Sequence, residues 1–173
     1  MDTPLEHLTT RHGFRFDVRP VTADDGPIFE EFFTHVTQAD LRFRFLTGMN
    51  KVGHDRIAAL TLVDHQLTEN FVAFPEGESV MIATGMLACD AALDTGEVAI
   101  VIRDDYKRRG ISWELLAYIA RFADRKGVKS LQSIESRANH AAIELEREMG
   151  FKASEFPGDA TLILLSRKNS KLA

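Results

Sequence analysis

Three cations stand directly before a glycine near the middle of the chain. Lys107, Arg108 and Arg109 precede Gly110, and a glycine lets a ligand come close because it has no Cβ. Apolar residues then recur at helical spacing from Ile111 onward, which predicts a helix. The first N–H groups of a helix have no acceptor within it and lie at the positive end of its dipole. The turn therefore predicts a site for a phosphate or diphosphate.

The segment before this turn must be the strand that positions it. Residues 98–102 are five apolar residues in a row, as is typical of a strand covered on both faces. Glu97 begins the strand and shares a side with Ala99 and Val101, because side chains alternate between faces. A partly buried carboxylate at this place suits a general base that acts directly or through water. The alternative is a hairpin glutamate that faces solvent.

A second chemical element follows at residues 139–151, N-H-A-A-I-E-L-E-R-E-M-G-F. It predicts an amphipathic helix with Asn139 as its N-cap and Gly150 at its end. The two best-known phosphate loops, G-x-x-x-x-G-K-[ST] and G-x-G-x-x-G after a strand, do not occur.

Both elements resemble motifs of the GNAT superfamily of N-acetyltransferases. Residues 107–112 are similar to the pyrophosphate pattern [QR]-x-x-G-x-[GA], with Lys107 and Ser112 as departures, and residues 139–151 to N-x-x-[apolar]-x-x-L-x-x-x-G-F. Residues 97–105 resemble E-x-A-x-x-V-R-D-D, and residues 41–45 resemble L-R-x-R-F. These two patterns are typical of the bacterial GNAT lysine acetyltransferases that modify acyl-CoA synthetases, which this chain therefore resembles. The resemblance extends over about residues 18–167.

The resemblance implies acetyl-CoA as the acyl donor, with no metal, and assigns residues to it. Glu97 would be the catalytic base. The backbone of Ile100, Val101 and Ile102 would bind the pantetheine arm and the thioester carbonyl, and Asn139 would lie near that arm. Arg44, Asp64 and His65 would line the acceptor side, with surface charges and a loop turn as the alternative. The pyrophosphate would be held by Lys107, Arg108, Arg109, Gly110, Ile111, Ser112 and Trp113.

The implied activity is an acetyl-CoA-dependent N-acetyltransferase that acts on a primary amine. A protein lysine is the leading acceptor, with an acyl-CoA synthetase as the partner that the resemblance suggests. The alternatives are a small-molecule amine as acceptor, or an inactive CoA-binding regulatory module. Many GNAT enzymes carry a tyrosine general acid after the leucine of the second motif, where this chain has Glu146. A homodimer is a further possibility that the sequence leaves undecided.

Composition narrows the class of protein further. The chain has 173 residues, 45% of them hydrophobic, which fits one domain with a sizeable core. The net charge of −5, from 21 basic and 26 acidic residues, argues against nucleic acid as a partner. No apolar run reaches the roughly 20 residues that cross a bilayer. The single cysteine, Cys89, and an N-terminus without signal-peptide features lead us to expect a cytoplasmic protein.

The predicted fold class is α/β, a GNAT-like acyl-CoA N-acyltransferase fold. The resemblance implies a mixed, mostly antiparallel central sheet, splayed at the cofactor site, with helices on both faces. We expect one domain at 13–168 and flexible tails at 1–12 and 169–173. Strands are predicted at 14–18, 70–74, 80–88, 97–103, 130–136, 151–154 and 160–166, and helices at 22–33, 41–46, 55–62, 111–122 and 139–149.

Overall fold

A mixed eight-stranded sheet forms the centre of the molecule, with strand order β1-β2-β3-β4-β5-β6-β8-β7. The computed structural model describes residues 5–46 and 51–169. The strands are β1 Glu6–Thr9, β2 Arg15–Pro20, β3 Thr68–Pro75, β4 Ala83–Cys89, β5 Thr95–Ile102, β6 Ser130–Ser136, β7 Lys152–Glu155 and β8 Leu162–Lys168. The helices are α1 Gly26–Phe33, α2 Gln38–Phe45, α3 His54–Thr61, α4 Ile111–Lys126 and α5 His140–Glu148, with short 3-10 turns at Ala23–Asp25 and Asp104–Tyr106.

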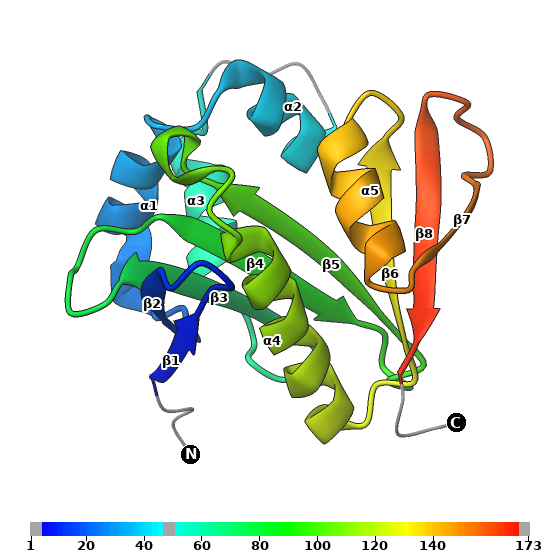
Figure 1. Cartoon of the computed structure of the whole chain (residues 1–173), viewed down its shortest axis with the longest axis horizontal. Helices are drawn as coiled ribbons and strands as arrows, with labels where there is room; N and C mark the ends of the chain where they lie inside the picture. Colours follow the sequence, from blue (N-terminus) through cyan, green and yellow to red (C-terminus); the bar gives the residue numbers. More distant parts are fainter. Residues whose placement is uncertain (1–4, 47–50, 170–173) are drawn as a thin grey trace.

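Strands β5 and β6 separate soon after they begin. All other neighbours in the sheet are antiparallel, whereas β5 and β6 are parallel and pair only from Thr95 with Ser130 to Glu97 with Gln132. Beyond that point β6 continues to pair with β8 as far as Ser136, while β5 continues to pair with β4 as far as Ile102. The sheet therefore opens into a V between β5 and β6 (Figure 1).

One face of the sheet is covered by α4, with α5 beside it (Figure 1). Leu115, Ile119 and Ala123 recur every fourth residue of α4 and are fully buried, so they form the stripe that packs on the strands. A Cβ on Gly85 of β4 would lie 2.6 Å from Ile119 Cδ1. This glycine therefore lets α4 pack directly on β4, which fixes the start of α4 beside the opening of the sheet.

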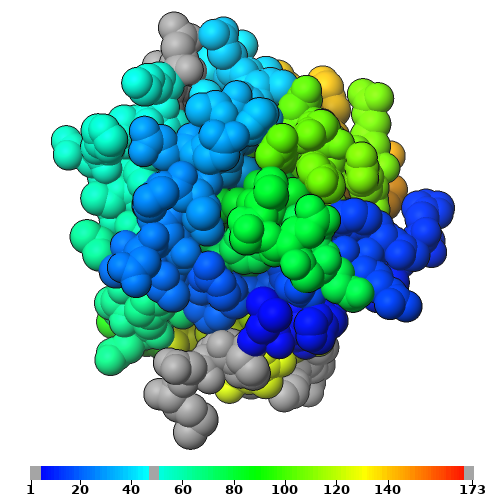
Figure 2. Space-filling model, turned by 90° about the vertical axis from the view of Figure 1, so that its left-hand side faces the viewer, coloured from blue at the N-terminus to red at the C-terminus, as the bar shows by residue number. Residues whose placement is uncertain are grey.

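The opposite face is covered by α1 and α3. Phe29, Phe32 and Phe33 of α1 pack with Val72 of β3 and Val101 of β5 in a second buried cluster. Figure 2 shows α1 in blue beside α3 in cyan on this side of the molecule. The two clusters hold β5 from both faces, as its unbroken apolar run predicts.

The predicted fold class is confirmed, and most elements lie within a few residues of their expected bounds. The sequence missed β1, which lies in the segment expected to be a flexible tail. Glu6 to Thr9 pair with β2, and only Leu8 of this strand is buried, so the strand has no clear alternation to reveal it. At the other end, Asn169 is 3% exposed and its side chain donates to the Val128 carbonyl. Residues 1–4 and 170–173 of the expected tails lie outside the described ranges.

An aspartate closes the turn between β4 and β5. Asp90 Oδ1 accepts hydrogen bonds from the backbone N–H groups of Asp94 (2.8 Å) and Thr95 (3.3 Å). Aspartate is common in turns because its side chain can accept such bonds from the backbone. In the described parts of the chain, no helix is long and apolar enough to span a membrane.

Candidate active site

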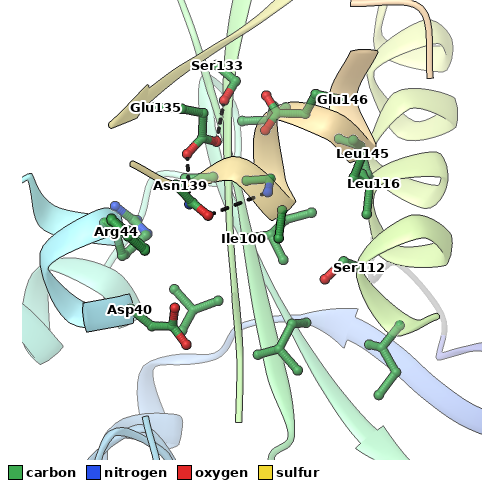
Figure 3. A pocket seen from close by; sticks show the side chains of 18 of the residues that line it. Asp40, Arg44, Ile100, Ser112, Leu116, Ser133, Glu135, Asn139, Leu145 and Glu146 are labelled. Carbon is green, nitrogen blue, oxygen red and sulfur yellow. Dashed lines mark hydrogen bonds between the residues drawn. The ribbon is translucent and has the colours of Figure 1, made fainter. Parts of the chain in front are cut away.

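A cavity of about 470 Å3 lies where β5 and β6 separate. The β5 strand forms one wall, and β6 with α5 forms the other. The basic turn and the start of α4 close one end. Asp40, Phe43 and Arg44 of α2 also line the cavity, as does Leu46, which follows this helix. Figure 3 shows lining side chains that face the same space from several elements, among them Arg44 of α2, Ser112 of α4 and Glu135 of β6.

The β5 wall consists of every residue from Glu97 to Ile102. The ladder with β6 ends at Glu97, so one edge of residues 98–102 has no strand partner among the described residues. Along a strand, the N–H and C=O groups of successive residues point to opposite edges. Arg103 N–H donates to the Ile82 carbonyl, and the Thr95 carbonyl accepts from Asp90 N–H, so the odd-numbered residues of this segment bond toward β4. Ile100 and Ile102, but not Val101, therefore present backbone N–H and C=O groups to the cavity side. A free strand edge can bind the amides of an extended ligand as a further strand would.

The basic turn has a backbone that few residues can adopt. Arg108 has φ +64° and Gly110 has φ +85°, and Gly110 is the N-cap of α4. A Cβ on Gly110 would lie 3.3 Å from Thr10 Cβ. The glycine is therefore needed for the left-handed turn and for contact with the N-terminal segment, in addition to the ligand approach that the sequence suggested. Gly110, Ile111, Ser112 and Trp113 all line the cavity.

The structure brings two of the three predicted cations to this cavity. Lys107 and Arg108 line it, and Lys107 Nζ lies 2.6 Å from Asp40 Oδ2, which ties the turn to α2. Arg109 is not among the lining residues. Its guanidinium lies over the rings of Tyr106, at 4.6 Å, and Phe14, at 5.7 Å. Arg109 thus contacts aromatic rings next to the turn, an arrangement that spacing along the sequence cannot reveal.

A hydrogen-bonded group on β6 and α5 forms the far wall. Ser133 Oγ donates to Glu135 Oε1 at 2.7 Å, and Asn139 Nδ2 donates to Glu135 Oε2 at 3.3 Å. Asn139 Oδ1 accepts from the N–H of Ala142 at 3.5 Å, which confirms Asn139 as the N-cap of α5. Both Asn139 and Glu135 line the cavity (Figure 3).

Glu146 lies next to this group and is buried, with 5% of its surface exposed. Its Oε1 has no hydrogen-bond partner among the described residues. Burial first, and then a hydrogen bond to the neighbouring Glu135 and its charge, raise the pKa of Glu146 to about 9, while a hydrogen bond from Ser133 opposes this rise. Glu146 therefore carries a proton at neutral pH.

Arg44 is a cation of the cavity lining that interacts with two of its carboxylates. Burial lowers the pKa of its guanidinium, the charges of Glu97 and Glu135 oppose that effect, and Arg56 adds to it. Its guanidinium also lies 5.0 Å from the centre of the Phe45 ring. Arg44 thus lies in the field of both carboxylates on the α2 side, where the acceptor residues were expected.

Asp64 and His65 are not among the residues that line the cavity. Asp64 Oδ1 accepts hydrogen bonds from the N–H groups of Gln66, Leu67 and Thr68, each at 2.9 Å. These bonds lower the pKa of Asp64, and the bond from Thr68 has the largest effect. His65 Nδ1 lies 2.8 Å from Glu69 Oε1. The two residues organise the loop before β3, which agrees with the loop-turn alternative.

The lining residues that the sequence missed include four polar side chains, Asp40, Tyr106, Ser133 and Glu135. Ser133 and Glu135 follow Leu131 at alternate positions of β6, so they lie on the same face as that core residue. This alternation was visible in the sequence. The separation of β6 from β5, which turns that face toward a cavity, was not.

Two other kinds of chemistry, a metal site and an acyl-enzyme on Cys89, can be compared with the described residues. These residues contain no group of three His, Cys, Asp or Glu side chains placed to hold a metal ion. Cys89 is half-buried at the end of β4 and is not among the lining residues. Burial raises the pKa of the Cys89 thiol, which leaves little thiolate for an acyl-enzyme.

Residues 31–151 match the model of the acetyltransferase (GNAT) family, and this match covers more than half of the chain. The chain belongs to this family and is an N-acetyltransferase by family. The family uses acetyl-CoA, which accords with a cavity that combines a free strand edge and a helix N-terminus.

Known proteins are similar to this chain in sequence or in fold. Acetyltransferase PA5475 of Pseudomonas aeruginosa is 27% identical over 149 residues, which cover 85% of this chain and 80% of that protein. The GNAT domain of S. lividans PAT superposes with a TM-score of 0.87 at 22% identity, over 96% and 99% of the two chains. Spermidine N-acetyltransferase from Vibrio cholerae, solved with CoA and spermine, has a TM-score of 0.72 at 14% identity, over 90% and 96%.

Proposed function

We propose that this protein transfers an acetyl group from acetyl-CoA to a primary amine, with a protein lysine as the leading acceptor. The observation that carries the proposal is the position of Glu97. It is the last residue of β5 paired with β6 and the first residue of β5 that lines the cavity. A carboxylate at that point meets the opening of the sheet, where a thioester held along the β5 edge would lie.

The donor would bind along the wall built by β5 and the basic turn. The backbone groups of Ile100 and Ile102 would bind the pantetheine arm, while Val101 between them bonds toward β4 and Asn139 lies on the opposite wall. Residues 107–113 would hold the pyrophosphate, through the side chains of Lys107 and Arg108 and the first N–H groups of α4. Arg109 would act through the backbone and through its ring contacts.

The acceptor would enter from the α2 side, where Arg44 lies. Asp40, Glu97 and Glu135 line the cavity with carboxylates, and the chain carries a net charge of −5. This negative field would attract an ammonium group. Glu97 would then take a proton from the amine. Holding amine and thioester at attack distance can lower the barrier by about 7 to 11 kcal/mol.

The choice of lysine rests on the resemblance of residues 41–45 and 97–105 to bacterial lysine acetyltransferases of acyl-CoA synthetases. An acyl-CoA synthetase is therefore the first protein acceptor to test, and a cytoplasmic location and a homodimer belong to the same proposal. A small polyamine is the second candidate, because the superposable Vibrio cholerae enzyme acts on spermidine. Asp64 and His65 would serve either acceptor only through the loop that they organise.

The test is calorimetric titration with acetyl-CoA, CoA and ATP, followed by assay of thiol release with a lysine peptide, an acyl-CoA synthetase and spermidine. We expect micromolar binding of both CoA species but not of ATP, and turnover that is faster with the protein lysine than with spermidine. Faster turnover with spermidine would favour the small-amine function. Binding without turnover on any amine would indicate an inactive CoA-binding module.

A further inference from the structure

We propose that Glu146 is the general acid that protonates the CoA sulfur as the thioester bond breaks. The inference rests on the proposed acetyl transfer and assigns a donor for the leaving group. It starts from a cavity-lining carboxyl on α5 that is almost fully buried and has an oxygen without a partner in the described structure.

The surroundings of Glu146 indicate a group that awaits a ligand. Leu116 of α4 and Leu145 of α5 line the cavity beside it (Figure 3). A buried polar atom without a hydrogen bond is costly, and Glu146 Oε1 is such an atom. Because the Glu146 side chain lines an open cavity, acetyl-CoA bound there can supply the missing hydrogen-bond partner.

Charged groups around Glu146 favour its protonated form. Facing it, β6 presents Glu135 and the hydroxyl of Ser133, β5 presents Glu97, and α2 presents Arg44 near Glu135. The lining residues of α4 carry no charge, and Arg167 of β8 lies at the far end of α5, where its Cδ would be 4.0 Å from a Cβ on Gly150. The nearest formal charge is the carboxylate of Glu135, which opposes ionisation of Glu146.

The acidity of Glu146 matches that of the leaving group. Burial and Glu135 raise the pKa of Glu146 to about 9, while a thiol of the cysteine type has a pKa of about 8.5. A proton transfer between groups of similar pKa has little free-energy cost in either direction, and an acid that stays protonated at neutral pH is ready to donate.

The step balances with two carboxyl groups. The ammonium group first loses one proton to solvent. The neutral amine nitrogen then bonds to the acetyl carbon, and a second proton goes from this nitrogen to Glu97. As the carbon–sulfur bond breaks, its electron pair goes to sulfur, and the proton of Glu146 is transferred there to give the free thiol. After the products leave, Glu97 releases its proton to solvent and Glu146 takes one up.

The two carboxyl groups have unlike surroundings, as acid and base pairs in active sites do. Glu97 is half-exposed and lies in the field of the Arg44 cation. Glu146 is buried beside another carboxyl. Glu97 comes from the β5 wall of the cavity and Glu146 from the α5 wall. A thioester bound between the two walls would have the base, Glu97, on the side of the amine and the acid, Glu146, on the side of the sulfur.

The experiment compares the full chain with Glu146→Gln, Glu146→Asp and the matched control Glu144→Gln, which changes an exposed residue of the same helix. Thiol release is followed from pH 6 to 10, and acetyl-CoA affinity is measured by calorimetry. We expect kcat to fall about 10- to 1,000-fold in Glu146→Gln, with affinity within twofold of the parent. Glu146→Asp should retain more activity than Glu146→Gln, and Glu144→Gln should behave as the parent.

The pH profile separates an acid from a structural residue. The parent should lose activity above about pH 9, where Glu146 ionises, and Glu146→Gln should lose this alkaline limb. Glu135→Gln should move the limb to lower pH, because it removes the charge that opposes ionisation. Infrared spectroscopy gives a readout without turnover: a protonated carboxyl band should persist at pH 7, titrate near pH 9 and be missing in Glu146→Gln.

Three results would overturn the proposal. The first is a Glu146→Gln variant with the parent's kcat and alkaline limb, and the second is a variant that loses acetyl-CoA affinity in proportion to its rate. The third is an infrared titration that finds Glu146 ionised at pH 7. A parent protein that binds no acetyl-CoA would overturn the proposed function itself, and the calorimetry distinguishes that failure from the failure of Glu146 alone.

Discussion

Glu97 and Gln132 form the last residue pair between the parallel strands β5 and β6. Three pairs join these strands, and β6 then follows β8 while β5 follows β4. The side chain proposed as general base therefore stands where the sheet opens. The short ladder has two consequences, because it frees the β5 edge to bind a ligand and also places a carboxylate beside that ligand.

Replacing Glu97 should remove turnover and leave donor binding intact. Glu97→Gln keeps the shape of the side chain but cannot accept the amine proton, so we expect kcat to fall about 100- to 10,000-fold. Thiol release with the best acceptor measures this, with acetyl-CoA affinity from calorimetry beside it. Glu78→Gln, in the exposed β3–β4 turn, is the control. Unchanged turnover in Glu97→Gln would refute the assignment of the base.

Lys107 and Arg109 should behave differently although they are two residues apart. Lys107 lines the cavity, so Lys107→Ala should weaken acetyl-CoA binding by about 1.5 to 3 kcal/mol, or roughly 10- to 150-fold. Arg109→Ala should weaken binding less and should lower stability by about 0.5 to 1 kcal/mol, because its guanidinium lies over Tyr106 and Phe14. Calorimetry and denaturant unfolding measure the two effects. An equal loss of affinity in both variants would contradict this division.

The ion pair between Lys107 and Asp40 gives a further test of the basic turn. Lys107 Nζ lies 2.6 Å from Asp40 Oδ2, so a bound diphosphate competes with this carboxylate for the ammonium group. Asp40→Asn should therefore strengthen CoA binding, and the double variant with Lys107→Ala should lose that gain. Calorimetry of both variants provides the measurement. Weaker binding in Asp40→Asn would show that the ion pair holds the turn in its binding form.

Asp25 should make stability fall in acid. Burial raises the pKa of Asp25, but hydrogen bonds from Arg19 and from the N–H of Thr22 outweigh it and lower the pKa below 3.8. The stabilisation is complete above pH 3.8 and is lost as the pH falls through the lower folded-state value. Asp25→Asn should cost about 1.5 to 3 kcal/mol at pH 7. Urea unfolding at pH 7 and pH 3 measures this, and an equal cost at both values would contradict the pKa argument.

Glu146 should have the opposite effect on stability. Its pKa is raised from 4.5 to about 9, so between these values the folded chain holds a proton that the unfolded chain has released. The free energy of unfolding therefore falls as the pH rises through this range. Glu146→Gln should remove the effect and should be more stable than the parent at pH 9 by more than about 1.4 kcal/mol, the equivalent of one pKa unit. Thermal unfolding from pH 5 to 9 measures it, and a constant difference would contradict the shift.

The sequence by itself determined the elements and the chemistry of the basic turn. The apolar run of β5, the helical spacing of α4 and the N-cap Asn139 are local patterns, because each depends on residues that are neighbours along the chain. The family resemblance rested on the same local motifs. The fold class could therefore be predicted. So could part of the cavity lining, including Glu97 and residues 100–102, 107, 108 and 110–113.

Tertiary structure decided which side chains meet. Arg109 contacts rings from two segments, Asp64 and His65 organise a loop, and β1 gains its place only by pairing with β2. The carboxyl group of Glu146 owes its raised pKa to burial and to Glu135, which lies eleven positions away on another element. Burial and long-range electrostatics depend on distances in space, and these are fixed only when β6 leaves β5 and α5 packs over the opening.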